Sequence, residues 1–76
     1  MLNGSCLCGA VTFTATGTAK DPAACHCSQC RKQSGHYWAA VNVPMSGFAV
    51  SGDVRWYAAS PAAKRGFCPT CGSFLF

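Results

Sequence analysis

The sequence predicts a mostly β domain: a small antiparallel sheet with one short helix, held together by bound metal. Three observations favour this class. The chain has 76 residues, too few to bury a large apolar core, so a domain of this size usually needs an additional constraint. Short segments have the alternation and β-branched content of strands. Seven cysteines fall into three tight groups, within residues 6–8, 25–30 and 68–71.

The first expected strand covers residues 10–16, which alternate and are rich in threonine and β-branched side chains. Gly17 and Asp21-Pro22 interrupt the stretch that leads to the middle cysteines. Ser28 is then expected to cap a short helix that ends at Ser34-Gly35.

The second half of the chain predicts more strands. Residues 37–43 form one candidate, which Pro44 ends. Residues 48–50 and 54–57 predict a hairpin around Ser51-Gly52-Asp53, and residues 73–76 begin a final strand. Together these elements give a mostly antiparallel β domain.

The grouping of the cysteines indicates metal ligation rather than disulfide bonding. Cysteines one or two residues apart rarely bridge each other, and an odd number leaves a thiol unpaired. Such pairs are suited to a tetrahedral ion such as zinc. The four outer sulfurs would complete one zinc site, and the three middle sulfurs would leave a second site one ligand short.

The outer cysteines predict a structural Cys₄ zinc. Cys68 and Cys71 precede Gly72, a spacing typical of a zinc knuckle whose turn needs the positive φ that glycine allows. Cys6 and Cys8 lie two residues apart, so their side chains share one face of an extended chain. Such a site would supply much of the folding free energy. The alternative is that Cys6 and Cys8 are ordinary buried residues.

The middle cysteines predict an open zinc site. Cys25 and Cys27 share a face by the same rule, and Cys30 returns on the first turn of the helix. His26 would point the opposite way, which favours a packed or substrate-facing side chain over a ligand. His36 lies beyond the helix, and we expect only packing or exposure there.

A zinc ion with three thiolate ligands is a weak Lewis acid, but it can accept an exogenous thiolate. The middle site therefore favours thiol and aldehyde chemistry over hydrolysis. A second zinc without activity is the alternative.

The charge of the chain excludes an obvious nucleic-acid role. The formal net charge is +4. Seven thiolates and two Zn²⁺ together contribute −7 + 4 = −3, which leaves +1. The basic pairs Arg31-Lys32 and Lys64-Arg65 flank two cysteine groups, so they either balance the metal centres or are solvated surface residues.

The composition also predicts a folded cytoplasmic protein. Half the residues are hydrophobic and 11% are charged, which argues against disorder. Residues 1–5 contain no apolar run, so we expect no signal peptide, and no stretch is long enough to span a membrane. Thiols stay available for zinc in the reducing cytosol.

Three motifs in order and one short pair resemble the glutathione-dependent formaldehyde-activating enzyme family, which includes relatives of centromere protein V. They are Gly4-Ser5-Cys6-Leu7-Cys8-Gly9-Ala10-Val11, Cys25-His26-Cys27-Ser28-Gln29-Cys30-Arg31-Lys32, Ser34-Gly35 and Phe67-Cys68-Pro69-Thr70-Cys71-Gly72-Ser73. The resemblance covers nearly the whole chain.

The resemblance implies an Mss4-like β-tent and a carbon–sulfur lyase that adds the thiol of glutathione to formaldehyde, giving S-(hydroxymethyl)glutathione. It implies a structural zinc on the outer cysteines and a catalytic zinc on the middle ones, which are Cys25, Cys27 and Cys30. The family domain usually continues for several strands after the last cysteine pair. Residues 1–76 are therefore expected to be one domain without those strands.

The expected partner is glutathione or another small thiol, and neither nucleic acid nor a membrane. A second copy of the chain could pair with an exposed sheet edge. The competing hypothesis is a non-catalytic module with two inert zinc ions. It would present four aromatic residues to a protein partner: Phe48, Trp56, Tyr57 and Phe74.

Overall fold

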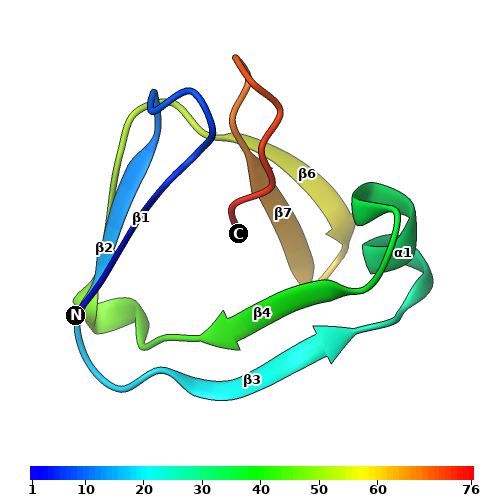
Figure 1. Cartoon of the computed structure of the whole chain (residues 1–76), viewed down its shortest axis with the longest axis horizontal. Helices are drawn as coiled ribbons and strands as arrows, with labels where there is room; N and C mark the ends of the chain where they lie inside the picture. The colour runs from blue at the N-terminus through cyan, green and yellow to red at the C-terminus, as the bar shows by residue number, and fades with distance from the viewer.

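The computed structural model describes residues 1–76 and has three small antiparallel sheets and one α-helix (Figure 1). The strands are β1 (Leu2–Ser5), β2 (Thr12–Ala15), β3 (Lys20–Cys25), β4 (Trp38–Asn42), β5 (Phe48–Ser51), β6 (Arg55–Ser60) and β7 (Ala63–Phe67). Helix α1 spans Ser28–Ser34, and a 3-10 turn, η1, covers Met45–Gly47. The predicted class, mostly β with one short helix, is confirmed.

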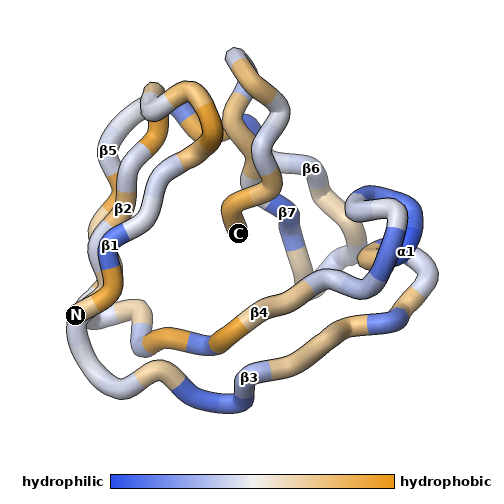
Figure 2. The backbone as a smooth tube through the Cα atoms, in the orientation of Figure 1, coloured by the Kyte–Doolittle hydropathy of each residue, from blue (hydrophilic) through white to orange (hydrophobic).

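The three sheets surround the last residues of the chain, which lie near the centre of the molecule (Figure 1). The sheets have the orders β1-β2-β5, β3-β4 and β6-β7. The centroid of the Phe76 ring lies 5.1 Å from that of Phe48 and 5.3 Å from that of Phe13, both in the β1-β2-β5 sheet. It lies 5.9 Å from the ring centroid of Trp56 in the β6-β7 sheet. This central segment is hydrophobic (Figure 2) and joins two sheets by packing.

The predicted hairpin at residues 48–57 is wrong. β5 pairs with β2, from Ala15 opposite Phe48 to Thr12 opposite Ser51, and β6 pairs with β7. The turn between β5 and β6 explains the difference. Gly52 has φ +101° and lies against the Ala10 carbonyl, so this turn packs on the chain before β2. The chain then leaves the first sheet instead of folding back on it.

The predicted strand at residues 73–76 is also wrong, because these residues form no regular strand. One bridge joins Phe74 to Phe67, and the Gly66 N–H donates to the Phe76 carbonyl at 2.8 Å.

Three strands were not predicted: β1, β3 and β7. β3 contains Asp21 with φ +52° and Pro22, and its register with β4 shifts between Lys20 and Ala23. Proline is tolerated there because β3 pairs on one side only.

The core is small, as expected, and it is built around sulfur. Only six residues are buried, and Cys6, Cys30 and Cys68 are three of them. Cys6 and Cys68 pack with Val11 in one cluster. Neither the helix nor the 3-10 turn is long and apolar enough to cross a membrane.

Candidate metal centres

The outer cysteine group, Cys6, Cys8, Cys68 and Cys71, comes together as predicted. The four sulfurs lie within 4.8 Å of one another. The Cys6 and Cys8 sulfurs are 3.6 Å apart, and those of Cys8 and Cys68 are 3.8 Å apart. Sulfurs at tetrahedral corners about 2.3 Å from zinc lie about 3.8 Å apart, so this group fits a four-coordinate ion.

Backbone hydrogen bonds shape both halves of the outer group. The Val11 N–H donates to the Cys6 sulfur at 3.3 Å, and the Cys6 N–H donates to the Val11 carbonyl at 3.0 Å. In the second half, the Gly72 N–H donates to the Cys68 carbonyl at 2.8 Å, with Gly72 at φ +77°. The glycine predicted to close the knuckle therefore has the expected conformation.

Ser73 connects the two halves, a role that the sequence did not reveal. Its hydroxyl oxygen accepts the Leu7 N–H at 2.9 Å and lies 3.1 Å from the Cys71 sulfur. A hydroxyl directly after the knuckle glycine was the only signal available. One side chain thus fixes the alignment of segments 66 residues apart.

The thiols of the outer group differ in acidity. The Ser73 hydroxyl, aided by the Ser73 N–H, lowers the pKa of Cys71 to about 5, and the Val11 N–H lowers the pKa of Cys6. The Ala10 N–H acts to lower the pKa of Cys8, but the neighbouring thiol of Cys6 and burial outweigh it and raise that pKa to about 11. Thiols this close cannot all ionise without a compensating cation.

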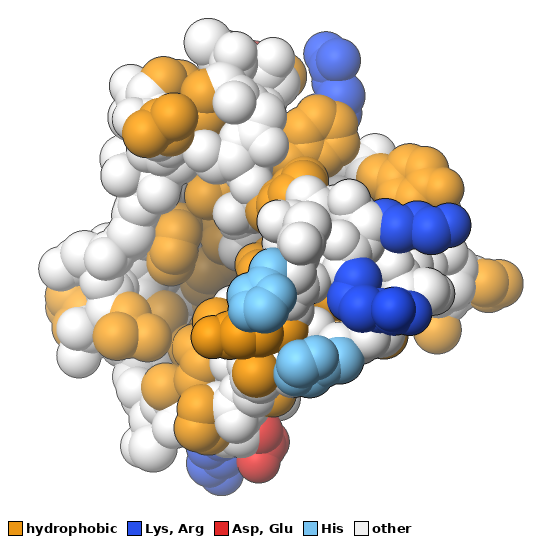
Figure 3. Space-filling view, turned by 45° about the vertical axis from the view of Figure 1, so that its right-hand side comes forward, with side chains coloured by type: hydrophobic (Ala, Val, Ile, Leu, Met, Phe, Trp, Pro, Cys, Tyr) orange, Lys and Arg blue, Asp and Glu red, His pale blue; other side chains and the backbone are white.

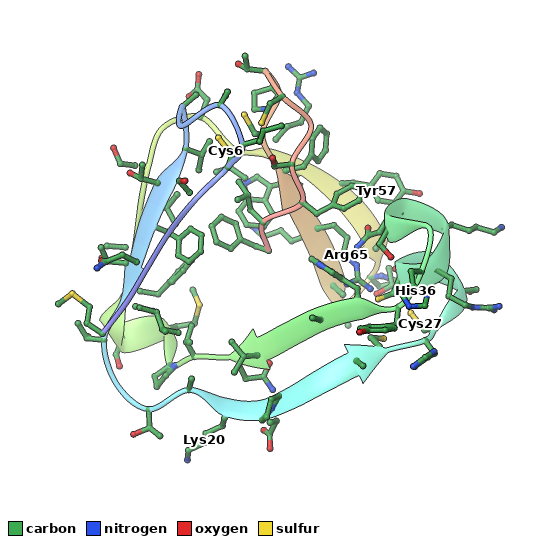
Figure 4. All side chains as sticks on the ribbon, in the orientation of Figure 1. Cys6, Lys20, Cys27, His36, Tyr57 and Arg65 are labelled. Carbon is green, nitrogen blue, oxygen red and sulfur yellow. The ribbon has the colours of Figure 1, made fainter.

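The middle cysteine group, Cys25, Cys27 and Cys30, also comes together, with its three sulfurs within 4.8 Å of one another. Cys25 ends β3, Cys27 precedes α1, and Cys30 lies in the first turn of α1. Cys30 is buried, whereas Cys27 is exposed. Solvent therefore reaches this group on the side of Cys27, which Figure 4 labels beside α1.

Cys27, not Ser28 as predicted, caps α1. Its backbone is extended, with φ −63° and ψ 161°, and its sulfur accepts the Cys30 N–H at 3.4 Å. Ser28 is already helical, so it cannot serve as the cap. The predicted end is confirmed: Gly35 has φ +78°, and its N–H donates to the Arg31 carbonyl.

The same hydrogen bond sets the acidity of the middle group. The Cys30 N–H, followed by the thiols of Cys30 and Cys25, lowers the pKa of Cys27 to about 7. The Cys25 thiol and burial raise the pKa of Cys30 to about 11. Of Cys27 and Cys30, the more acidic thiol is thus the exposed one.

Neither histidine belongs to the middle group. Both rings pack against Tyr37, with centroids 5.4 Å away for His26 and 4.3 Å away for His36. Both lie on the face that carries α1, together with cationic side chains (Figure 3). This arrangement agrees with the expectation that the His26 side chain points away from the sulfurs.

The basic residues beside the cysteines have different environments. Lys64 Nζ lies 4.3 Å from the centroid of the Trp56 ring. Arg65 Nη2 donates to Gln29 Oε1 at 2.9 Å, and Gln29 Nε2 donates to the Ala59 carbonyl at 3.4 Å. Gln29 therefore ties α1 to the β6-β7 sheet, and no sequence pattern had marked it.

The four aromatic residues of the interaction hypothesis differ in packing and exposure. Phe48 packs on Phe13 and Phe76, and Trp56 stacks on Phe76. Phe74 packs edge-on against Trp38, with centroids 6.2 Å apart. Tyr57 is the most exposed of them, at 63%, and Trp56 and Phe74 are 43% and 44% exposed.

Comparison with known proteins gives one match. A family model described as glutathione-dependent formaldehyde-activating enzyme matches residues 1–76. No curated protein and no solved structure matches the chain.

Proposed function

Because this chain belongs to the glutathione-dependent formaldehyde-activating enzyme family, we propose that it joins a small thiol to formaldehyde or a related aldehyde. The thiol would be glutathione, and the product S-(hydroxymethyl)glutathione, which makes the protein a carbon–sulfur lyase. The observation that carries the proposal is the middle cysteine group, three converging sulfurs open to solvent on one side.

The proposal assigns zinc to both cysteine groups, with different roles. The outer group offers four sulfurs at tetrahedral spacing, two of them buried in the core, which suits a structural ion. The middle group offers three sulfurs and no fourth protein ligand, which suits a catalytic site. Zinc bound there would supply an open coordination position for the sulfur of an incoming thiol and would favour its thiolate form.

The chain's own residues would bind and orient the reactants. Cys25, Cys27 and Cys30 would hold the metal, with the buried Cys30 closing one side of it. In the reaction, the thiol loses its proton and the thiolate sulfur attacks the carbonyl carbon. A C–S bond forms as the C=O π bond breaks, and the oxygen takes up one proton from water, which balances the proton lost by the thiol. No electron transfer is needed. Arg31, which follows Cys30 on α1, would attract a carboxylate of the tripeptide.

The rest of the proposal concerns the whole protein. Residues 1–76 would form a single domain of the Mss4-like β-tent type. It would act in a reducing compartment such as the cytoplasm, where the cysteines stay free for metal. A second copy could pair with an edge strand of one of the three sheets, since each sheet has open edges.

Calorimetry with glutathione tests the proposal on zinc-loaded protein. We expect saturable binding that weakens as salt rises, because charged carboxylates are screened. Cys27→Ser should abolish it. S-methylglutathione is the matched control ligand, because it keeps both carboxylates and lacks the free thiol. Equal binding of the two ligands would show that the sulfur is not recognised and would contradict the proposal.

Turnover is tested separately by exchange NMR with ¹³C-formaldehyde. The protein should accelerate interconversion between formaldehyde and its glutathione adduct, and Cys27→Ser should not. A fully zinc-loaded protein that gives no acceleration supports the alternative, a non-catalytic two-zinc interaction module.

A further inference from the structure

A second feature of the molecule, separate from both cysteine groups, is a pocket of about 450 Å³ between α1 and the β6-β7 sheet. None of the seven cysteines lines it. Its polar wall is Gln29, Lys32 and Gln33 of α1 with Arg65 of β7. In Figure 4, Arg65 extends from β7 toward α1.

Two hydrogen-bond donors at this pocket have no acceptor. Arg65 Nε and Gln33 Nε2 are both buried and unpartnered. The remaining part of the Arg65 side chain is held in place, since its Nη2 donates to Gln29 Oε1. Buried N–H groups are nearly always paired in folded proteins, so two free donors at one pocket are suited to an acceptor that enters it.

The side chains at this pocket carry positive charge and no negative charge. Arg65 and Lys32 contribute two positive charges, and no acidic residue lines the pocket. The chain has only two acidic residues, and they lie elsewhere: Asp21 in β3 and Asp53 after β5. The neutral Gln29 is the only side chain that accepts a hydrogen bond from Arg65. An anion therefore suits the pocket better than a neutral acceptor.

The rest of the wall is aromatic. Trp38 and Phe74 meet edge to face, and Tyr57 lines the pocket from β6. The Arg65 guanidinium carbon lies 5.7 Å from the centroid of the Trp38 ring. A planar guanidinium beside aromatic rings matches a planar carboxylate carried on a flat apolar group.

We propose that this pocket binds a small organic carboxylate with an aromatic or similarly flat apolar body. Arg65 would pair with the carboxylate, Gln33 would donate to it, and Trp38 and Phe74 would pack on the apolar part. The site goes beyond the thiol chemistry proposed above, since no cysteine lines the pocket and its carboxylate contacts differ from those proposed for glutathione.

The test is an NMR titration of the full chain with 2-naphthoate. We expect saturable shifts of the Trp38 indole N–H and of the Gln29 and Gln33 side-chain amides. Arg65→Met should weaken binding at least tenfold. Lys64→Gln is the matched control: it removes the same charge from the neighbouring residue of β7, whose side chain stacks on Trp56 instead, and should change affinity less than twofold.

Two further ligands test the roles of the carboxylate and of the flat apolar body. 2-Naphthamide, which keeps the shape without the charge, should bind at least tenfold more weakly, and inorganic phosphate should not compete at equal concentration. If Arg65→Met misfolds, Gln33→Glu tests the same point by placing a negative charge on the wall. Equal binding of acid and amide, equal loss in Lys64→Gln, or unchanged binding in the folded Arg65 or Gln33 variant would overturn the proposal.

Discussion

The outer and middle cysteine groups have similar sulfur spacing, but they join very different lengths of chain. The sulfurs of Cys8 and Cys68 lie 3.8 Å apart across 60 residues. The middle group lies within the six residues from Cys25 to Cys30. Closing the longer loop costs roughly 2 kcal/mol more in chain entropy, from the logarithmic dependence on loop length.

The two groups also differ in what surrounds them. Cys6 and Cys68 are part of the small core, packed against Val11. Cys27 is exposed at the start of α1. The difference teaches that similar groups of thiols can have different effects on the fold. An ion bound between distant, buried segments would hold the fold, whereas an ion bound by neighbouring residues would be gained or lost with little change elsewhere.

The largest expected effect comes from removing a ligand of the outer group. Cys68→Ala should leave the chain unfolded, because a structural zinc site contributes on the order of 10 kcal/mol or more, about as much as the total stability of a small domain. Cys27→Ala is the matched variant and should stay folded. Circular dichroism and amide dispersion in NMR measure both. Equal unfolding of the two variants would show that both groups hold the fold.

Chelator treatment should separate the two groups without any mutation. The middle group should lose its metal first, with little change in circular dichroism, because it is open to solvent. The outer group should release its metal only as the fold is lost. Simultaneous zinc assay and circular dichroism record the two steps. Release of all metal in one cooperative step would show that the outer and middle groups do not differ in how they hold metal.

A smaller effect is expected at Val11, which is fully buried beside Cys6 and Cys68. Val11→Ala should lower the free energy of unfolding by about 1–3 kcal/mol through the cavity that it leaves. The control is Val41→Ala on β4, where the side chain is 44% exposed and the loss should stay below about 0.5 kcal/mol. Urea unfolding of zinc-loaded protein measures both. Similar losses in the two variants would show that packing around the outer sulfurs contributes no more to the free energy of unfolding than a surface contact does.

The smallest expected effects come from one glycine beside each group. Gly35 and Gly72 have φ +78° and +77°, and a Cβ at either would meet no atom within 4 Å. Alanine at each should therefore cost about 1 kcal/mol of backbone strain. Gly72→Ala should weaken metal binding at the outer group about fivefold, whereas Gly35→Ala should affect only α1. Competition with a zinc indicator and hydrogen exchange of α1 amides separate these results.

The cysteine groups were predictable from the sequence because each ligand pair is local. Cysteines two or three residues apart can converge through a short local backbone segment. The predicted extended chain at Cys6 and Cys8 is wrong, however: a turn joins them, in which the Gly9 N–H donates to the Cys6 carbonyl at 3.3 Å. The end of α1 at Gly35 is local as well, since it needs only a left-handed residue.

The pairing of strands was less predictable, because it depends on segments far apart. β5 and β6 follow each other like a hairpin, yet β5 adds to β2, some 36 residues earlier, where Phe48 packs on Phe13. β3 was missed because Asp21-Pro22 is typical of a loop, and only its pairing with β4 makes it a strand. The pocket at Arg65 draws on residues from 29 to 76, so no local pattern indicates it.

The 60 residues between Cys8 and Cys68 also set an order of events during synthesis. At about 5–20 residues per second, roughly 3–12 s pass between the emergence of these two ligands from the ribosome. The middle group is complete by residue 30 and can take up metal early. During that interval Cys6 and Cys8 form a half-site exposed to oxidants or to foreign metals. If the proposed zinc sites form, the nascent chain should therefore depend on the zinc supply and redox state around the ribosome more than the folded protein does.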